Sequence, residues 1–490
     1  MKKSMGYMLL AALLLQMVSC GSGDGNAAED TTPTNETTTQ SETVVETTYL
    51  DTLPATDLGG ATINTLIREE CQDEFSADLT GDVIDEAVYN RNLALEERFS
   101  CTLTYTIEPG SWAYAATYQD TIRGTVMAGD DTYDMVTGQS NIIQPLNAEG
   151  VFVNLLDEDV IDLTRPYWVD SYADGINLAG KVCTLCGDFA LSSFSQANVI
   201  FFNKSIMDDY GIAYPYELTL EGNWTLDTFM GMAEDTTIDL NGDQVLDLSD
   251  LRGFCAYGNS VQPFFSSCGL EYTHIGDDGK RQINTPSDTM VEIADRLNTF
   301  CHSTSFANAM KVYDNTNGLG LEPAMAQSFM EGSYLFMGMV LDGIEELRDM
   351  EVDFGILPYP KANAEQSAYR TTILRRYTVA AIPGTAKDSS SSALILEAMA
   401  AEGYDKIIPK YYEVALKTKY IRDESSSQVL DLIKNSLYLE FADLYYTDLG
   451  MSDFFAVYVI DNNAGTFAST WEKQSTTWAT KLAKLYEMNA

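Results

Sequence analysis

Short β-rich runs alternate with amphipathic stretches in this chain, and this alternation constrains its fold more than any other feature. The runs 61–67, 101–107 and 133–137 have the composition of strands, and the stretches 82–99 and 118–128 between them have that of helices. Strands separated by helices of this length predict parallel α/β layers. The fold class expected from the residues alone is therefore α/β.

The alternation continues to the end of the chain, and no internal repeat is visible. Within the first expected helix, the predicted buried positions include Val83, Ala87, Leu93 and Leu95. The later expected strands are 198–203, 335–340, 354–357 and 378–382. The later expected helices are 225–234, 287–301, 389–402, 407–416, 426–435 and 471–486.

The first twenty residues have the layout of a secretion signal. Lys2 and Lys3 precede an apolar run at 8–15 that is too short to span a bilayer, and Cys20 follows small and apolar residues. This arrangement resembles the bacterial lipoprotein signal, in which the cysteine is lipidated and becomes the mature N-terminus. The alternative is an ordinary secretory signal with an incidental cysteine. Both interpretations place the protein outside the cytoplasm.

The segment after Cys20 is expected to be a disordered tether over residues 21–56. Residues 21–48 are rich in Gly, Ser, Thr, Asn, Asp and Glu, with almost no large apolar side chain to offset the entropy of ordering. Folded sequence is expected to begin near Asp57, which leaves roughly 430 residues for two or three domains or one large bilobal unit. No later apolar run is long enough to cross a membrane.

The charge of the chain is strongly acidic, with 29 Lys and Arg against 73 Asp and Glu and a net charge of −44. Such a field repels nucleic acid and anionic lipid headgroups, so neither is expected as a partner. The charge is typical of solubility at a cell surface. It also favours a neutral or cationic ligand, and the two interpretations are compatible.

Seven cysteines remain when Cys20 is set aside, and an odd number cannot all pair within the chain. Cys183 and Cys186 have redox or metal spacing, but no second pair lies nearby and the chain has only 2 histidines, which argues against a zinc site. We expect buried free thiols, with one bridge such as Cys255–Cys268 as the alternative. The seven are Cys71, Cys101, Cys183, Cys186, Cys255, Cys268 and Cys301.

Five motifs in order carry a resemblance to a known family. They are YDMVTGQSNIIQPLNAEGVFVNL (133–155), NVIFFNKSIMDDYGI (198–212), GNWTLDTFMGMAED (222–235), SFMEGSYLFMG (328–338) and VDFGILPYPKAN (352–363). Over about residues 58–490 the chain resembles the extracellular solute-binding proteins of ABC importers, in particular the large sugar-binding family 1. No single motif is specific, because each can be an ordinary helix or strand boundary. Their order carries the resemblance.

The resemblance implies a two-lobed periplasmic-binding-protein-like fold of class II. Each lobe is then a mostly parallel sheet flanked by helices, with the ligand cleft between the lobes. The order of the motifs places crossings between the lobes near 190–195, near 369–374 and around 416–420. The implied lobes are 57–190 plus 374–416 and 195–370 plus 420–490.

The function implied by the resemblance is non-catalytic capture of an extracellular solute, above all a carbohydrate or oligosaccharide, and its delivery to the permease subunits of an ABC transporter. Such a protein is a monomer, held on the extracellular face of the cell membrane by its lipid anchor alone. One alternative is a surface carbohydrate-active hydrolase, although no catalytic motif such as a nucleophile elbow is present. Another is a surface sensor or adhesin with no role in transport.

Sugars present hydroxyl rims and apolar faces, so their sites combine aromatic platforms with planar polar side chains. Aromatic or polar residues at the ends of expected strands and near the crossings are therefore the candidates. For each aromatic candidate the alternative is core packing; Trp224 in particular can act as a hydrophobic staple before its helix. Arg375 can instead pair with surface carboxylates. The candidates are Trp112, Tyr114, Gln139, Ser140, Trp168, Gln196, Trp224, Tyr257, Asp342 and Arg375.

The segment DLNGDQVLDLSD, residues 239–250, has the spacing of an EF-hand-like calcium loop. Gln244 stands where the sharp turn usually has Gly, and Asp250 replaces the closing Glu, so weak affinity is expected. We expect a structural calcium ion, and the alternative is a solvated polar turn. The expected ligands are Asp239, Asn241, Asp243, Val245 through its backbone carbonyl, Asp247 and Asp250.

Overall fold

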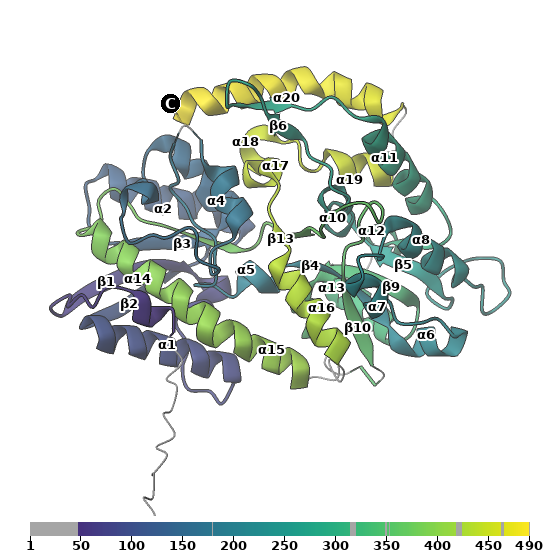
Figure 1. Cartoon of the computed structure of the whole chain (residues 1–490), viewed down its shortest axis with the longest axis horizontal. Helices are drawn as coiled ribbons and strands as arrows, with labels where there is room; N and C mark the ends of the chain where they lie inside the picture. The colour runs from purple at the N-terminus through teal and green to yellow at the C-terminus, as the bar shows by residue number, and fades with distance from the viewer. Residues whose placement is uncertain are drawn as a thin grey trace, which may run out of the picture. The chain divides into compact units, whose positions relative to one another are not determined.

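The computed structural model describes residues 48–178, 180–313, 320–347, 350–351, 353–417, 424–461 and 465–489. They belong to one compact unit, Thr47–Ala490. Two separate β-sheets with helices packed against them form its framework (Figure 1). The α/β fold class expected from the sequence is confirmed.

The first sheet has the strand order β12-β3-β1-β2. Strand β1 (Ala61–Arg68) pairs in parallel with β2 (Cys101–Glu108) and β3 (Met135–Gln139), whereas β12 (Thr378–Ala381) runs antiparallel to β3. The parallel strands are joined by helices, because parallel neighbours need a crossover connection. These helices are α1 (Val83–Phe99) and α2 (Ala115–Met127).

Helix α1 begins and ends where its sequence provides caps. The carboxylate of Asp82 accepts hydrogen bonds from the backbone amides of Ile84 and Asp85, which satisfies donors that a helix leaves unpaired. The helix ends at Ser100, whose backbone is left-handed with φ of 50°. It packs against α14 (Ser389–Glu402) and α15 (Ile408–Lys417), which follow each other along the chain through a π-helical turn at Gly403–Ile407.

The second sheet has the order β10-β4-β9-β5-β8 and is mixed. Strand β4 (Asn198–Asn203) is antiparallel to both β10 (Phe354–Pro358) and β9 (Tyr334–Val340). Strand β5 (Arg252–Ala256) is parallel to both β9 and β8 (Phe306–Asn308). Its central strands β4 and β9 are buried along their whole length, which explains their nearly continuous apolar sequences.

Aromatic side chains fill the core beside the second sheet. The ring of Phe229, on α8 (Leu226–Asp235), lies 5.0 Å from that of Phe254 and 5.4 Å from that of Phe336, measured between centroids. Gly253 allows β5 to approach α8 closely, since a Cβ atom at this position would lie 2.0 Å from the carbonyl oxygen of Ala233. Helices α11 (Asp288–Cys301) and α13 (Leu321–Met330) contact β8 and β9 respectively.

Two chain segments run side by side between the sheets. Ala197 forms an antiparallel bridge with Ile373, and the amide of Leu374 donates to the carbonyl of Gln196 at 2.8 Å. The first segment includes the short helix α5 (Ser192–Ser195), and the second includes β11 (Thr371–Thr372), which pairs with β13 (Leu437–Tyr438). They lie where the first two crossings are predicted. Most of the third predicted crossing falls outside the described residues.

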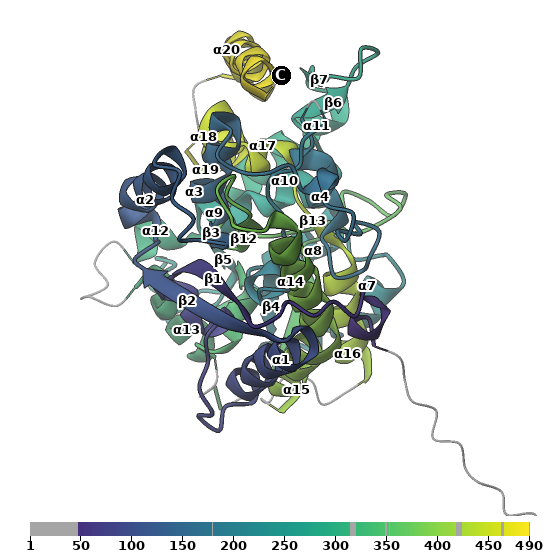
Figure 2. The same cartoon turned by 90° about the vertical axis from the view of Figure 1, so that its left-hand side faces the viewer.

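The C-terminal helices contact elements that lie far from them along the chain. Helix α16 (Glu424–Asn435) packs against β10 and α7 (Tyr216–Leu220). Helix α20 (Phe467–Asn489), yellow at the top of Figure 2, contacts β7 (Arg281–Ile283) and also the 3₁₀ helix Gln144–Glu149 that follows β3. Among the helices in the described ranges, none is long and apolar enough to span a membrane.

Candidate functional site

A pocket lies where the ends of strands from both sheets meet the two connecting segments. Its empty volume, including space open to solvent, is about 790 Å³. We refer to it as the inter-sheet pocket. Its lining residues are Arg68, Glu70, Cys71, Ser111, Gln139, Ser192, Gln196, Glu322, Met339, Val340, Asp342, Gly343, Glu346 and Arg376.

The first sheet contributes residues at or just after the carboxyl ends of its parallel strands, the edge at which open α/β sheets bind ligands. Arg68 ends β1, Gln139 ends β3, and Ser111 lies in the loop after β2. The carboxylate of Glu70 accepts hydrogen bonds from the amides of Gly110 at 3.0 Å and Ser111 at 2.9 Å. Glu70 therefore fixes the position of the loop after β2.

A chain of side-chain contacts crosses the pocket. The guanidinium of Arg376 pairs with the carboxylate of Glu322, on α13, at 3.2 Å and donates through Nε to Oε1 of Gln196 at 3.2 Å. The Nε2 group of Gln196 then donates to Oδ2 of Asp342, just after β9, at 3.3 Å. Arg376 and Gln196 lie in the connecting segments, so this network ties them to two elements beside the second sheet.

Arg68 is held rigidly at the first-sheet side of the pocket. Its Nη2 group donates to the carbonyl of Arg376 at 2.7 Å and to the hydroxyl of Thr378 at 3.0 Å. That hydroxyl donates in turn to the carboxylate of Glu74, which also accepts the amide of Ser192 at 2.7 Å. Buried polar groups joined in this way keep one geometry, because an unpaired member is costly.

Burial is the main influence on ionisation in the pocket. Burial, reinforced by the nearby carboxylate of Glu345 and opposed by the guanidinium of Arg376, raises the pKa of Asp342 to about 6. Burial, with the charge of Glu74, raises the pKa of the Cys71 thiol to about 12. Cys71 therefore presents a neutral, weakly nucleophilic thiol to the pocket at neutral pH.

Three of the predicted ligand residues, Gln139, Gln196 and Asp342, line the inter-sheet pocket together. Tyr257 does not line the pocket itself but contacts a residue that does, because its hydroxyl donates to the carboxylate of Glu322 at 2.6 Å. Ser140 follows Gln139 and is buried, with its hydroxyl donating to the carbonyl of Arg375 at 3.0 Å. The structure thus brings these positions to one region, and their contact with a ligand stays a prediction.

Trp112 and Tyr114 lie in a 3₁₀ helix directly after Ser111, which lines the pocket. Their side chains are 57% and 50% exposed. Their exposure leaves both rings open to contact with a ligand, although single exposed apolar residues are ordinary. Among the exposed aromatic residues, these two lie closest in sequence to a residue that lines the pocket.

Trp224 and Trp168 lie elsewhere. Trp224 is 0% exposed and its indole donates to the carbonyl of Pro358 at 2.9 Å, so it packs in the core, as the alternative interpretation expects. Trp168 is buried, and its indole donates to the carboxylate of Glu397 at 3.2 Å. Neither side chain lines the inter-sheet pocket. The complete burial of Trp224 corrects the expectation of ligand contact at that residue. Trp168 lines a separate pocket with Tyr404 and Lys434, and its contact with a ligand stays a prediction.

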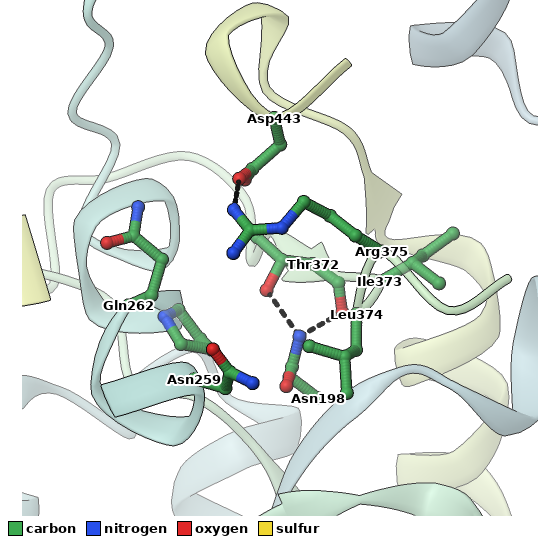
Figure 3. A pocket seen from close by; sticks show the side chains of 9 residues that line it. Asn198, Asn259, Gln262, Thr372, Ile373, Leu374, Arg375 and Asp443 are labelled. Carbon is green, nitrogen blue, oxygen red and sulfur yellow. Dashed lines mark hydrogen bonds and ion pairs between the residues drawn. The ribbon is translucent and has the colours of Figure 1, made fainter. Parts of the chain in front are cut away.

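Arg375 lines a second, smaller pocket beside the connecting segments (Figure 3). Its guanidinium pairs with Asp443 and with Asp453, each at 2.8 Å, and lies 3.9 Å from the ring centroid of Tyr446. These carboxylates and the ring already surround the guanidinium. Arg375 therefore fits the ion-pairing alternative better than a ligand contact.

Several residues of the inter-sheet pocket were missed from the sequence. Arg68, Glu70 and Cys71 end or follow β1, so the strand-end rule that found Gln139 also pointed to them. Glu322 had no such signal, because it reaches the pocket from within α13. Arg376 directly follows the candidate Arg375, and sequence does not reveal which of two adjacent arginines faces the pocket.

The loop at 239–250 is folded by its own carboxylates. Oxygens of Asp239 accept the amides of Gly242 and Gln244 at 2.6 Å and 2.8 Å, and those of Asp250 accept the amides of Leu240 and Asp247. Gln244 has φ of 67°, so it adopts the turn conformation for which glycine is usual. Within the described ranges, no group of three or more His, Cys, Asp or Glu side chains converges in a way that could hold a metal.

All seven cysteines of the described residues are free, and six of them are buried. Cys255 lies on β5 and Cys268 follows α10 (Pro263–Ser267), and no bridge joins them. Buried free thiols are therefore confirmed, and the alternative of a Cys255–Cys268 bridge is not.

No protein-family model matches the chain, and no curated protein does. Solved structures match it along most of its length. UspC of M. tuberculosis has a TM-score of 0.55 at 12% identity, covering 86% of this chain and 100% of that one. A sugar transporter from Rhizobium etli, in an open conformation, has a TM-score of 0.55 at 15% identity, covering 87% and 99%.

A third match is the ABC substrate-binding protein Lmo0181 of Listeria monocytogenes in complex with cycloalternan. Its TM-score is 0.53 at 13% identity, covering 86% of this chain and 99% of that one. At such identities the likeness is one of fold. The chain has the two-lobed, periplasmic-binding-protein-like α/β fold of the extracellular solute-binding proteins of ABC importers, the family that its sequence motifs resemble.

Proposed function

We propose that this protein captures an extracellular carbohydrate in the inter-sheet pocket without altering it. The observation that carries this proposal is the convergence of Gln139, Gln196, Asp342 and Arg376 in one pocket at the strand ends. Amide, carboxylate and guanidinium groups are planar partners for sugar hydroxyls. The exposed rings of Trp112 and Tyr114 nearby offer apolar faces against which a sugar can stack.

We also propose that the protein delivers its ligand to the permease subunits of an ABC transporter, and the fold supports this proposal. The matched proteins include sugar-binding proteins of such systems, and the motifs of this chain resemble that family. Lipidation of Cys20 would hold the protein at the extracellular face of the membrane as a monomer, with the polar segment behind it as a tether. These parts of the proposal rest on sequence, because residues 1–47 lie outside the described part of the chain.

Titration calorimetry of the purified protein against mono- and oligosaccharides tests the function. Capture predicts saturable binding of at least one saccharide, which is recovered chemically unchanged after denaturation of the protein. Shortened saccharide products would instead support the surface hydrolase. A sensor or adhesin would be favoured if the protein binds a saccharide but deletion of adjacent permease genes leaves uptake of that saccharide unchanged.

We also propose that the loop at 239–250 binds calcium in a structural role. Its oxygen-bearing residues have EF-hand-like spacing, and hard cations take six to eight oxygens. Several of these oxygens now accept backbone amides of the same loop. An ion would have to compete with those hydrogen bonds, so the expected affinity is low.

A further inference from the structure

The charges that line the inter-sheet pocket do not balance. Four carboxylates face two guanidinium groups, in a pocket whose lining includes no aromatic ring within the described residues. The charged residues are Arg68, Glu70, Glu322, Asp342, Glu346 and Arg376. An excess of negative charge in a partly desolvated space favours a positively charged group in its ligand.

Most of these charges are already engaged by the protein. Arg376 pairs with Glu322, and Glu70 accepts two backbone amides. Arg68 donates to a carbonyl and a hydroxyl. Asp342 is engaged weakly, since among the described residues it accepts a single long hydrogen bond of 3.3 Å from Gln196.

Both acceptors and a donor of the pocket can serve a ligand. Gln139 lines the pocket and donates through Nε2 to Asn141 at 2.9 Å, so its carbonyl oxygen can accept from a ligand, as can the second oxygen of Asp342. The Nε group of Arg68 is buried without a hydrogen-bond partner among the described residues and can donate to a sugar hydroxyl.

We propose that the captured carbohydrate carries a free, protonated amino group and that the carboxylate of Asp342 receives it. An ammonium group has three donors and no acceptor, so it supplies what Asp342 and Gln139 lack. A sugar hydroxyl can donate but leaves the charge uncompensated. This inference rests on the proposed carbohydrate function and names the class of sugar.

The surroundings of Asp342 support this assignment. Of the charges that act on this carboxyl, Glu345 has a stronger effect than Arg376, and Asp73 and Glu74 add to that of Glu345. Among the described residues, the negative potential at Asp342 is thus only partly compensated. A ligand cation in contact with it would form a charge-assisted hydrogen bond, the stronger kind in proteins.

Calorimetry with matched sugar pairs tests the proposal. The pairs are glucosamine and glucose, galactosamine and galactose, mannosamine and mannose, and the β-1,4-linked trimers of glucosamine, N-acetylglucosamine and glucose. We expect the amine to bind at least about tenfold more tightly than its neutral counterpart in the best-bound pair. Equal or tighter binding of the neutral member overturns this inference and leaves carbohydrate capture standing. Binding of no sugar in any pair overturns both.

Two variants locate the contact. Asp342→Asn keeps the shape of the side chain and should reduce the preference for the amine to about twofold or less, while the neutral sugar binds nearly as before. Glu292→Gln, on the exposed face of α11 and outside the pocket lining, makes the same change in net charge. This control variant should keep the full preference for the amine over the neutral sugar. If Asp342→Asn unfolds, Glu346→Gln at the exposed edge of the pocket replaces it, with a smaller loss expected. An amine preference retained in both pocket variants overturns the role of this carboxylate.

Discussion

Arg375 and Arg376 are adjacent in the chain, yet their guanidinium groups line different pockets. Arg375 is enclosed by Asp443, Asp453 and the ring of Tyr446. Arg376 reaches Glu322 and Gln196 in the inter-sheet pocket. The two arginines lie in a turn in which the amide of Tyr377 donates to the carbonyl of Leu374 at 3.2 Å, so one turn serves both stability and the candidate site.

This difference predicts opposite effects of one substitution at the two positions. Arg375→Met leaves the carboxylate of Asp443 buried without its partner, so the free energy of unfolding should fall by about 3 kcal/mol. Arg376→Met breaks a half-exposed ion pair and should lower it by less than about 1 kcal/mol, while sugar affinity falls about tenfold. Urea unfolding and calorimetry measure the two quantities. A stable Arg375→Met protein would contradict the assignment.

The tryptophans provide a second contrast. Trp224→Ala removes a fully buried ring and should lower the free energy of unfolding by about 3–5 kcal/mol. Trp112→Ala removes an exposed ring and should change it by less than about 0.5 kcal/mol. Loss of stacking in Trp112→Ala should weaken sugar binding about tenfold. Unchanged sugar affinity in this variant would remove Trp112 from the proposed site.

Stability should fall as the pH rises through neutrality, because Glu440 is buried. Burial, with the neighbouring Asp443, raises the pKa of this carboxyl from 4.5 to about 8. Between these values the folded chain holds a proton that the unfolded chain has lost. The stabilisation is complete below pH 4.5 and is lost as the pH rises through about 8, at up to about 1.4 kcal/mol per pH unit. Urea unfolding from pH 5 to 8 should show this slope, and Glu440→Gln should flatten it while Glu292→Gln keeps it.

Removal of calcium tests the loop at 239–250. A chelator should lower the free energy of unfolding by about 1–3 kcal/mol and the melting temperature with it, and added calcium should restore both. Asp239→Asn with Asp243→Asn should abolish the response. Asp277→Asn, in the exposed turn between β6 (Thr273–Ile275) and β7, is the matched control and should respond as the native chain does. A melting temperature that ignores both chelator and calcium would exclude a structural ion.

Lipid anchoring makes a prediction about location. Cys20→Ala should move the protein from the membrane fraction into the soluble exported fraction, because the acyl chains supply its membrane affinity. Cys71→Ala should leave it with the membrane. Fractionation followed by immunoblotting distinguishes the two. Membrane association that survives Cys20→Ala would contradict the anchor.

The secondary structure of this chain could largely be predicted from its sequence, since periodicity is a local property. Six elements begin and end within a residue or two of their expected positions, namely β1, β2, α1, β4, β9 and α14. The buried face of α1 was less predictable. Leu93 is exposed, while Arg91 is buried and donates to the carbonyls of Phe189 and Glu74. An arginine satisfied by distant backbone leaves no pattern in the sequence.

The candidate site could be predicted only in part, for the same reason. Gln139 and Asp342 follow strands, and strand ends gather at one edge of a sheet, so local signals were enough. Trp224 and Trp168 lie outside the inter-sheet pocket, because an aromatic ring before a helix or after a proline packs inward or outward according to its distant neighbours. Those neighbours, Pro358 and Glu397, lie more than a hundred residues away in the chain.

The free state of all seven described cysteines has a consequence for how this protein matures. Its fold needs no oxidant and no isomerase, because no covalent cross-link has to form or be reshuffled. The same chain can reach its native state in a reducing compartment or an oxidising one. Its production in a reducing cytosol, without refolding, is therefore a practical route to the binding and stability measurements above.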